Sequence, residues 1–413
     1  GHSMGGNLTV YVAGTDDRVK VAAPSVGGSG FRTQPWPLLP EQRKQTVHGD
    51  VRLFDATIGF ESYAPRIAAP LLWLGATNDF HGIMDDTYRT GQLIPHENVR
   101  YAFTPHMNHR FTPEFAATRP LWIDRYLKGT FQFPATPEST LQLSTDDGLP
   151  VLEVIPDTSL PIERVHILYS VDPDPQARFW RTAESTRGGE QWIARLPVMT
   201  VKQPLFAFAN VHYRLNQPEP VPFGPSTDTI AISSRLHTAT PQQLTDAAVS
   251  ETDTASLLID DFSKGWQDWY SLSAGNPHHW EYSTRKINDP QWRGRDGYRL
   301  ALDVRTEKAN ELVIVLTENF FRSYRGRTQE YVAVVKLDGG PETQTVTLDP
   351  HAFTTDDGQP LASWKCIDLL SLRAYHDKGS TLLGSKHWVG PQPTFQSLRW
   401  TASADATPGS CIE

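Results

Sequence analysis

The first residues of the chain carry the pattern that points most directly to chemistry. Gly1-His2-Ser3-Met4-Gly5 fits Gly-x-Ser-x-Gly, in which a serine lies on a sharp turn between a strand and a helix. Small flanking residues let the backbones approach and leave the serine hydroxyl exposed. The Met4 backbone N–H would begin the helix, where it can face negative charge developing on a substrate oxygen. We therefore predict Ser3 as a nucleophile and Met4 N–H as an oxyanion donor; the alternative for Ser3 is an ordinary helix N-cap.

A serine hydroxyl becomes a good nucleophile only when a base takes its proton, and an acid must orient that base. Asp79 follows the apolar run Pro70–Gly75, and His109 follows the run Val99–Phe103. We predict that His109 acts as general base and then general acid, and that Asp79 holds its imidazole. The competing candidates are Asp85 and Asp86 for the acid and His106 for the base.

These candidate residues follow elements whose patterns alternate between helix and strand. Helices are predicted at Met4–Ala13, about Met84–Leu93 and Pro113–Leu127, and strands at Val19–Ala23, Pro70–Gly75 and Val99–Phe103. Pro120 predicts a kink or break in the last helix. The alternation predicts an α/β fold with a parallel sheet layered by helices.

Residues 1 to about 133 resemble the C-terminal half of an α/β-hydrolase domain, with Gly1-His2-Ser3-Met4-Gly5-Gly6 as the nucleophile elbow. The triad order Ser, Asp, His matches Ser3, Asp79 and His109. The resemblance is to esterase and dienelactone-hydrolase-like members, and it implies ester hydrolysis without a cofactor. It also implies that early strands and a second oxyanion donor precede Gly1. We therefore expect a truncated chain that folds poorly over residues 1–133 and is inactive alone.

After Phe133 the pattern changes to short strands separated by turn residues. We predict an immunoglobulin- or fibronectin-like β module over 134–235, without chemistry of its own, and a linker over 236–255. The strand-like pattern of residues 256–413 predicts a second β-sandwich. This part is rich in tryptophan and resembles galactose-binding or jelly-roll carbohydrate-binding modules. Trp266, Trp269 and Trp280 can stack on sugars if exposed, but core positions are favoured.

Composition excludes several classes of protein. The 413 residues predict two or three domains of about 150 residues each. The 38 Lys and Arg against 47 Asp and Glu give a net charge of −9, which argues against nucleic acid as a partner. No apolar run reaches the roughly 18 residues that a membrane span needs. Unpaired thiols are favoured for the two cysteines, Cys366 and Cys411, with one bridge as the alternative in an exported protein.

Metal sites are not expected. His106 and His109 lie three residues apart, but no further cluster of metal ligands completes a site around them. Asp260-Asp261 is a candidate for calcium, although a solvated strand edge is favoured.

The prediction is thus a serine hydrolase that cleaves a small-molecule or polysaccharide ester, with the appended β modules favouring a periplasmic or secreted location. The alternatives are a prolyl-oligopeptidase-type serine peptidase, a carbohydrate-binding protein with a relic hydrolase domain, or a structural subunit.

Overall fold

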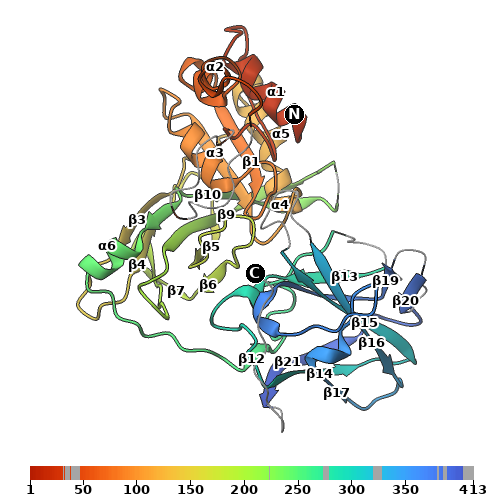
Figure 1. Cartoon of the computed structure of the whole chain (residues 1–413). Helices are drawn as coiled ribbons and strands as arrows, with labels where there is room; N and C mark the ends of the chain where they lie inside the picture. The colour runs from red at the N-terminus through yellow and green to blue at the C-terminus, as the bar shows by residue number, and fades with distance from the viewer. Residues whose placement is uncertain are drawn as a thin grey trace. The chain divides into compact units, whose positions relative to one another are not determined.

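The computed structural model describes residues 1–413 except 31, 33–37, 39–46, 223, 273–278, 320–327, 379–380, 385–387 and 403–413. Strands make up most of its regular structure, arranged in several sheets (Figure 1). The chain divides into two compact units, Gly1–Thr252 and Asp253–Glu413.

The first unit contains a group of parallel strands. Strand β1 (Leu71–Ala76) pairs in parallel with β2 (Val99–Thr104) along its whole length. On the other side of β1, Ala22 and Ser25 form parallel bridges with Leu71 and Leu74, and His2 bridges in parallel to Ser25. The predicted strand near residues 19–23 is thus present only as isolated bridges, whereas both apolar runs form the predicted buried strands.

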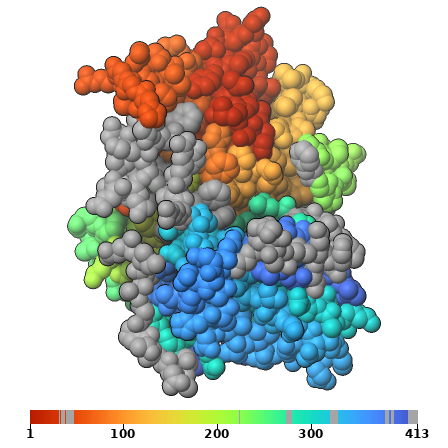
Figure 2. All heavy atoms as spheres, turned by 45° about the vertical axis from the view of Figure 1, so that its right-hand side comes forward, coloured from red at the N-terminus to blue at the C-terminus, as the bar shows by residue number. Residues whose placement is uncertain are grey.

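Side chains along a strand point alternately to its two faces. Helices pack against the side chains on both faces of these strands. Trp73 packs in one core with Val10 of α1 (Met4–Ala13) and Tyr88 of α3 (Met84–Gly91). Leu72 and Leu74 pack in the other core, with residues of α4 (Pro113–Ala116) and α5 (Thr118–Leu127). Atoms near the N-terminus, in red, lie at the surface in Figure 2. The side chains of Met4, Leu8 and Val12 on α1 are exposed.

The predicted helix Pro113–Leu127 is broken at Ala117, between α4 and α5. Pro120 explains the position of the break, because a proline has no N–H for the carbonyl four residues earlier, which is that of Ala116. Three short helical segments precede β1: α2 (Val51–Thr57), η1 (Phe60–Ser62) and η2 (Ala64–Arg66).

The predicted boundary at residue 133 is wrong. Strand β10 (Thr227–Ser233) pairs antiparallel with β2 through Ser233 and Tyr101, so the sheet continues through the order β1-β2-β10-β9-β5-β6. The added strands are β9 (Leu205–Glu219), β5 (Ile162–Ser170) and β6 (Arg181–Ala183), with β11 (His237–Ala239) also paired to β9. Hydrophobic patterns reveal strands but not which strand covers the free edge of β2.

A second sheet of the first unit has the order β3-β4-β8-β7, from β3 (Glu138–Gln142), β4 (Val151–Ile155), β8 (Gln191–Arg195) and β7 (Ser185–Gly188). One core contains Leu72 and Trp122 together with Leu152, Ile167 and Val211. Residues 134–235 therefore share a core with residues 1–133. The predicted linker 236–255 contains β11 and α6 (Pro241–Asp246), which Thr240 begins with a capping box.

The second unit is a β-sandwich, as predicted. Its antiparallel sheets have the orders β12-β21-β14-β17 and β13-β18-β15-β16, and a hairpin joins β19 and β20. The strands are β12 (Leu258–Asp260), β13 (Glu281–Thr284), β14 (Tyr298–Arg305), β15 (Asn310–Glu318), β16 (Gln329–Leu337), β17 (Gln344–Leu348), β18 (Ile367–Arg373), β19 (Tyr375–Lys378), β20 (Thr381–Gly384) and β21 (Thr394–Ala402). Short 3₁₀ turns are η3 (Lys286–Asn288), η4 (Pro350–Ala352) and η5 (Trp364–Cys366).

The core between these sheets contains Trp269 and Trp280 with Trp364, Trp388 and Trp400. Trp269 and Trp280 are buried, which removes them as platforms for a sugar ring, and Trp266 is stacked on Tyr282. Cys366 is disulfide-bonded, so the expectation of an unpaired thiol is wrong for this residue. Cys411 lies outside the described residues.

Candidate active site

Ser3, Asp79 and His109 meet because each follows a parallel strand segment. Ser3 comes directly after the bridge at His2, Asp79 comes after β1, and His109 comes after β2. The carboxyl ends of parallel strands lie at the same edge of a sheet, so loops far apart in the sequence converge there.

The backbone of Ser3 is held in an unusual conformation. Its φ is 57° and ψ is −120°, and its N–H donates to the carbonyl of Ser25 at 2.9 Å. Non-glycine residues seldom adopt positive φ, and such conformations cluster at functional sites. At this turn the chain leaves the short parallel segment that ends at His2 and enters α1.

Glycines make this turn sterically possible. A Cβ on Gly1 would lie 2.2 Å from the Gly5 carbonyl oxygen, and one on Gly27 would lie 2.4 Å from the Ser3 carbonyl oxygen. At Gly5 a Cβ meets no described atom within 4 Å, so close packing explains Gly1 but not Gly5. Gly27 has no place in the Gly-x-Ser-x-Gly motif, and sequence reasoning missed it.

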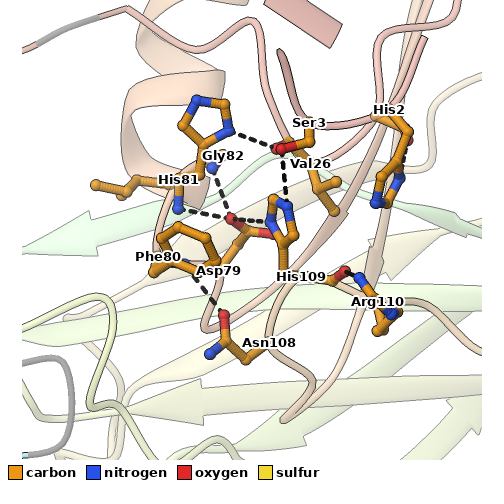
Figure 3. A network of polar contacts seen from close by, with 12 residues as sticks. His2, Ser3, Val26, Asp79, Phe80, His81, Gly82, Asn108, His109 and Arg110 are labelled. Carbon is orange, nitrogen blue, oxygen red and sulfur yellow. Dashed lines mark hydrogen bonds and ion pairs between the residues drawn. The ribbon is translucent and has the colours of Figure 1, made fainter. Parts of the chain in front are cut away.

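The three predicted side chains form one hydrogen-bonded chain (Figure 3). The Ser3 Oγ lies 3.0 Å from His109 Nε2, and His109 Nδ1 lies 3.0 Å and 3.1 Å from the two carboxylate oxygens of Asp79. With Nδ1 protonated and donating to Asp79, Nε2 is left with a lone pair toward the serine hydroxyl. This arrangement can move a proton from Ser3 to His109.

Asp79 has no exposed side-chain surface, and two backbone N–H groups donate to it. Its Oδ1 accepts the N–H groups of His81 and Gly82, both at 2.7 Å. These charge-assisted hydrogen bonds, together with the imidazole, compensate the carboxylate for the water it has lost. They also fix the direction in which the carboxylate points.

The competing candidates have other partners. Asp85 forms a bidentate ion pair with Arg178, and Asp86 pairs with Arg32 and Arg89. Burial raises the pKa of Asp86, and the two arginines oppose that rise. His106 is buried, with its ring stacked on that of Phe179 at 5.2 Å. None of these three residues has a described contact with Ser3.

Two further polar residues border the triad, and sequence reasoning predicted neither as a site residue. His81 Nδ1 donates to the Val26 carbonyl at 3.1 Å, and His81 Nε2 accepts from Asn7 Nδ2 at 3.3 Å. Asn7 also accepts the N–H of Gly28 at 2.6 Å. The only available signal was proximity in sequence to Ser3 and Asp79.

His2 lies beside the triad but forms a separate pair. Its Nδ1 is 3.0 Å from Ser25 Oγ, and its ring centre is 5.3 Å from that of His109. Burial lowers the pKa of His2 below its ordinary value; the neighbouring His109, Arg110 and Arg119 lower it further, and the Asp79 carboxylate opposes them.

Within the described residues, no group of three or more His, Cys, Asp or Glu side chains is arranged to hold a metal ion. Asp260, one of the calcium candidates, accepts from Trp269 Nε1 at 2.9 Å and lies 3.5 Å from Lys286 Nζ. Asp261 accepts from Ser263. Among the described helices, none combines the length and apolar character needed to cross a membrane.

No protein-family model and no curated protein matches the chain. Among solved structures, one described as addressing the promiscuous specificity of carbohydrate-binding modules of the β-sandwich superfamily shares 9% identity. It is matched over 100% of its length and 65% of this chain, with a TM-score of 0.19. An aminopeptidase from the marine sediment archaeon Thaumarchaeota archaeon shares 13% identity, covers 98% of this chain and 74% of its own, and has a TM-score of 0.23. Scores this low establish no common fold.

Proposed function

We propose that this protein is a serine hydrolase of the α/β-hydrolase type that cleaves carboxylic esters through an acyl-enzyme. One observation carries the proposal: the Ser3 hydroxyl lies 3.0 Å from His109 Nε2 while the other ring nitrogen of His109 contacts a fully buried carboxylate. The strained backbone of Ser3 at the start of α1 supports the same reading.

The reaction follows from these contacts. His109 Nε2 takes the proton of Ser3 as Oγ attacks the ester carbonyl carbon, and Asp79 stabilises the imidazolium that forms. The Met4 N–H lies at the first position of α1, has no acceptor within the helix, and can donate to the oxyanion. His109 then gives the proton to the departing alcohol. In the second half, water loses a proton to His109 and attacks the acyl carbon. His109 then returns this proton to Ser3 Oγ as the acid is released.

The proposal predicts that Ser3→Ala lowers kcat on p-nitrophenyl acetate by about a thousandfold or more, the scale typical of triad removal. The assay uses the natural full-length protein. Ser25→Ala is the matched control, because Ser25 also contacts a histidine, His2, at 3.0 Å, but no carboxylate of the described residues is hydrogen-bonded to that histidine. Its activity should stay within about threefold of wild type. Equal activity of Ser3→Ala and wild type contradicts the proposal.

The substrate class is tested in the same assay with an acetylated polysaccharide and with peptide amides. Release of acetate that depends on Ser3 supports a small-molecule or polysaccharide ester as substrate. Ser3-dependent cleavage of peptides, with little turnover of esters, would instead favour a serine peptidase. Glycan binding that survives Ser3→Ala without any turnover would favour a carbohydrate-binding protein.

A further inference from the structure

Residues 171–180 connect β5 to β6, in the segment for which the sequence predicts no chemistry. Hydrogen bonds within the loop restrain this connection. The Asp174 carbonyl accepts the N–H groups of Ala177 and Arg178 at 3.1 and 3.0 Å, and Asp174 Oδ1 accepts from Gln176 N at 3.0 Å. Pro173 and Pro175 fix two further φ angles. This loop can therefore transmit position to whatever it contacts.

It contacts the residues on both sides of Asp79. The Asn78 side-chain amide donates to the carbonyls of Gln176 and Arg178, at 3.2 and 2.7 Å. In return, Gln176 Nε2 donates to the Phe80 carbonyl at 3.0 Å. Both amide side chains are buried, with Asn78 0% and Gln176 4% exposed, so these hydrogen bonds do not compete with bulk water.

The loop is also anchored beyond Asp79. Arg178 is buried, and its guanidinium donates to both carboxylate oxygens of Asp85 at 2.7 and 2.9 Å. The guanidinium carbon lies 3.5 Å from the centre of the Phe206 ring. The segment 78–80 also contacts the segment that carries His109, since Phe80 N donates to Asn108 Oδ1 at 3.2 Å. The segment around Asp79 is thus hydrogen-bonded both to residues 171–180 and to the residue next to His109.

We infer that the 171–180 loop sets the position of Asp79 relative to His109, and that Gln176 is a positioning residue. This inference rests on the proposed serine hydrolase function. Gln176 has no described contact with Ser3, His109 or Asp79, so it acts through the Phe80 carbonyl. Displacing a catalytic group by about 1 Å can reduce the rate about a hundredfold.

The test is a double-mutant cycle in the full-length protein. Gln176→Met keeps the length of the side chain but removes the donor to Phe80. In the wild-type background we expect kcat to fall about 10- to 100-fold while KM changes less than about threefold. In an Asp79→Asn background the same change should lower kcat less than about threefold, because the group being positioned is no longer a carboxylate.

Tyr88→Phe is the control for a merely structural effect. The buried Tyr88 hydroxyl also donates across to the later part of the unit, to the Ser234 carbonyl at 2.6 Å, but contacts neither triad loop. Tyr88→Phe should lower the melting temperature about as much as Gln176→Met does, and should leave kcat within about threefold of wild type. If melting shows that Gln176→Met does not fold, Asn78→Ser replaces it in the cycle with the same expectation.

The outcomes separate the inference from the function on which it rests. A Gln176→Met effect that is equal in both backgrounds, or no larger than that of Tyr88→Phe, overturns the positioning role while Ser3→Ala still abolishes turnover. If Ser3→Ala retains full turnover, the proposed function fails and the positioning role fails with it.

Discussion

The residues around Ser3 carry much of the backbone strain of the first unit. Among its described non-glycine residues, positive φ occurs at Ser3, Val26, His106, His109 and Ala248, and the first four lie at or beside the proposed site. Each such conformation costs about 1–3 kcal/mol and persists only where neighbouring contacts enforce it. In the proposed mechanism, this cost is that of holding Ser3 and His109 in the geometry needed for proton transfer.

Gly27→Ala tests whether that geometry depends on close backbone packing. The new methyl would meet the Ser3 carbonyl oxygen at 2.4 Å, and a shift of the turn should lower kcat about a hundredfold. Gly188→Ala is the control, since its Cβ meets nothing within 4 Å. Steady-state kinetics of both variants against wild type check the expectation. A Gly27→Ala enzyme with wild-type kcat would show that the turn tolerates this displacement.

At the level of elements, the sequence is informative where a pattern is long and local. The run that forms β1 is apolar throughout because both its faces are buried, and α1 begins and ends where predicted. The three predicted site residues could be located for the same reason: Ser3 immediately precedes α1, Asp79 follows β1 and His109 follows β2. Glycine spacing identified Ser3, and order along the chain selected Asp79 and His109.

Contacts between segments far apart in the chain could not be predicted from the sequence. Gln176 lies in a polar, proline-containing loop that reads as a connection, and its bond to Phe80 spans 96 residues. The pairing of β10 with β2 likewise depends on which edge is free, and no residue of either strand encodes that choice alone. Predicting a separate module at residue 134 followed from a change in pattern, which records a change of secondary structure rather than the end of a core.

The buried histidine of β9 predicts how the stability of the first unit depends on pH. Burial holds the pKa of His212 well below 6.5, with Arg164 and His166 lowering it further. The unfolded chain therefore binds a proton that the folded chain does not, and stability is lost as the pH falls below 6.5. The loss from this group is at most about 1.4 kcal/mol per pH unit.

Urea unfolding at pH 7.0 and pH 5.5 measures this dependence. In wild type the free energy of unfolding should decrease at the lower pH, and in His212→Gln the decrease should be smaller by roughly 1 kcal/mol. Burial also lowers the pKa of His237, so the variant retains part of the effect. The same decrease in both proteins would remove His212 as its source.

For the whole molecule, the two units Gly1–Thr252 and Asp253–Glu413, rather than the three predicted modules, determine where a protease can cleave the chain and leave folded fragments. Phe133 is buried in a core that also contains Leu152 and Val211, whereas the described chain around Thr252 and Asp253 lies between the two units. Proteases cut preferentially where few contacts must open.

Limited proteolysis followed by mass spectrometry should therefore give stable fragments that end near Thr252, with none ending near Phe133. Cleavage of the full-length protein is followed over time at low protease concentration. A resistant fragment that begins near residue 134 would restore the predicted separate module.

The most direct test of the central claim is the reaction of the full-length protein with a fluorophosphonate, which traps an activated serine as its phosphonate ester with loss of fluoride. Peptide mapping should find one modified serine, Ser3, and the Asp79→Asn variant should react at least about a hundredfold more slowly because its histidine is no longer held for proton transfer. Labelling elsewhere, or none at Ser3 in a folded protein, would contradict the claim that Ser3, His109 and Asp79 act together.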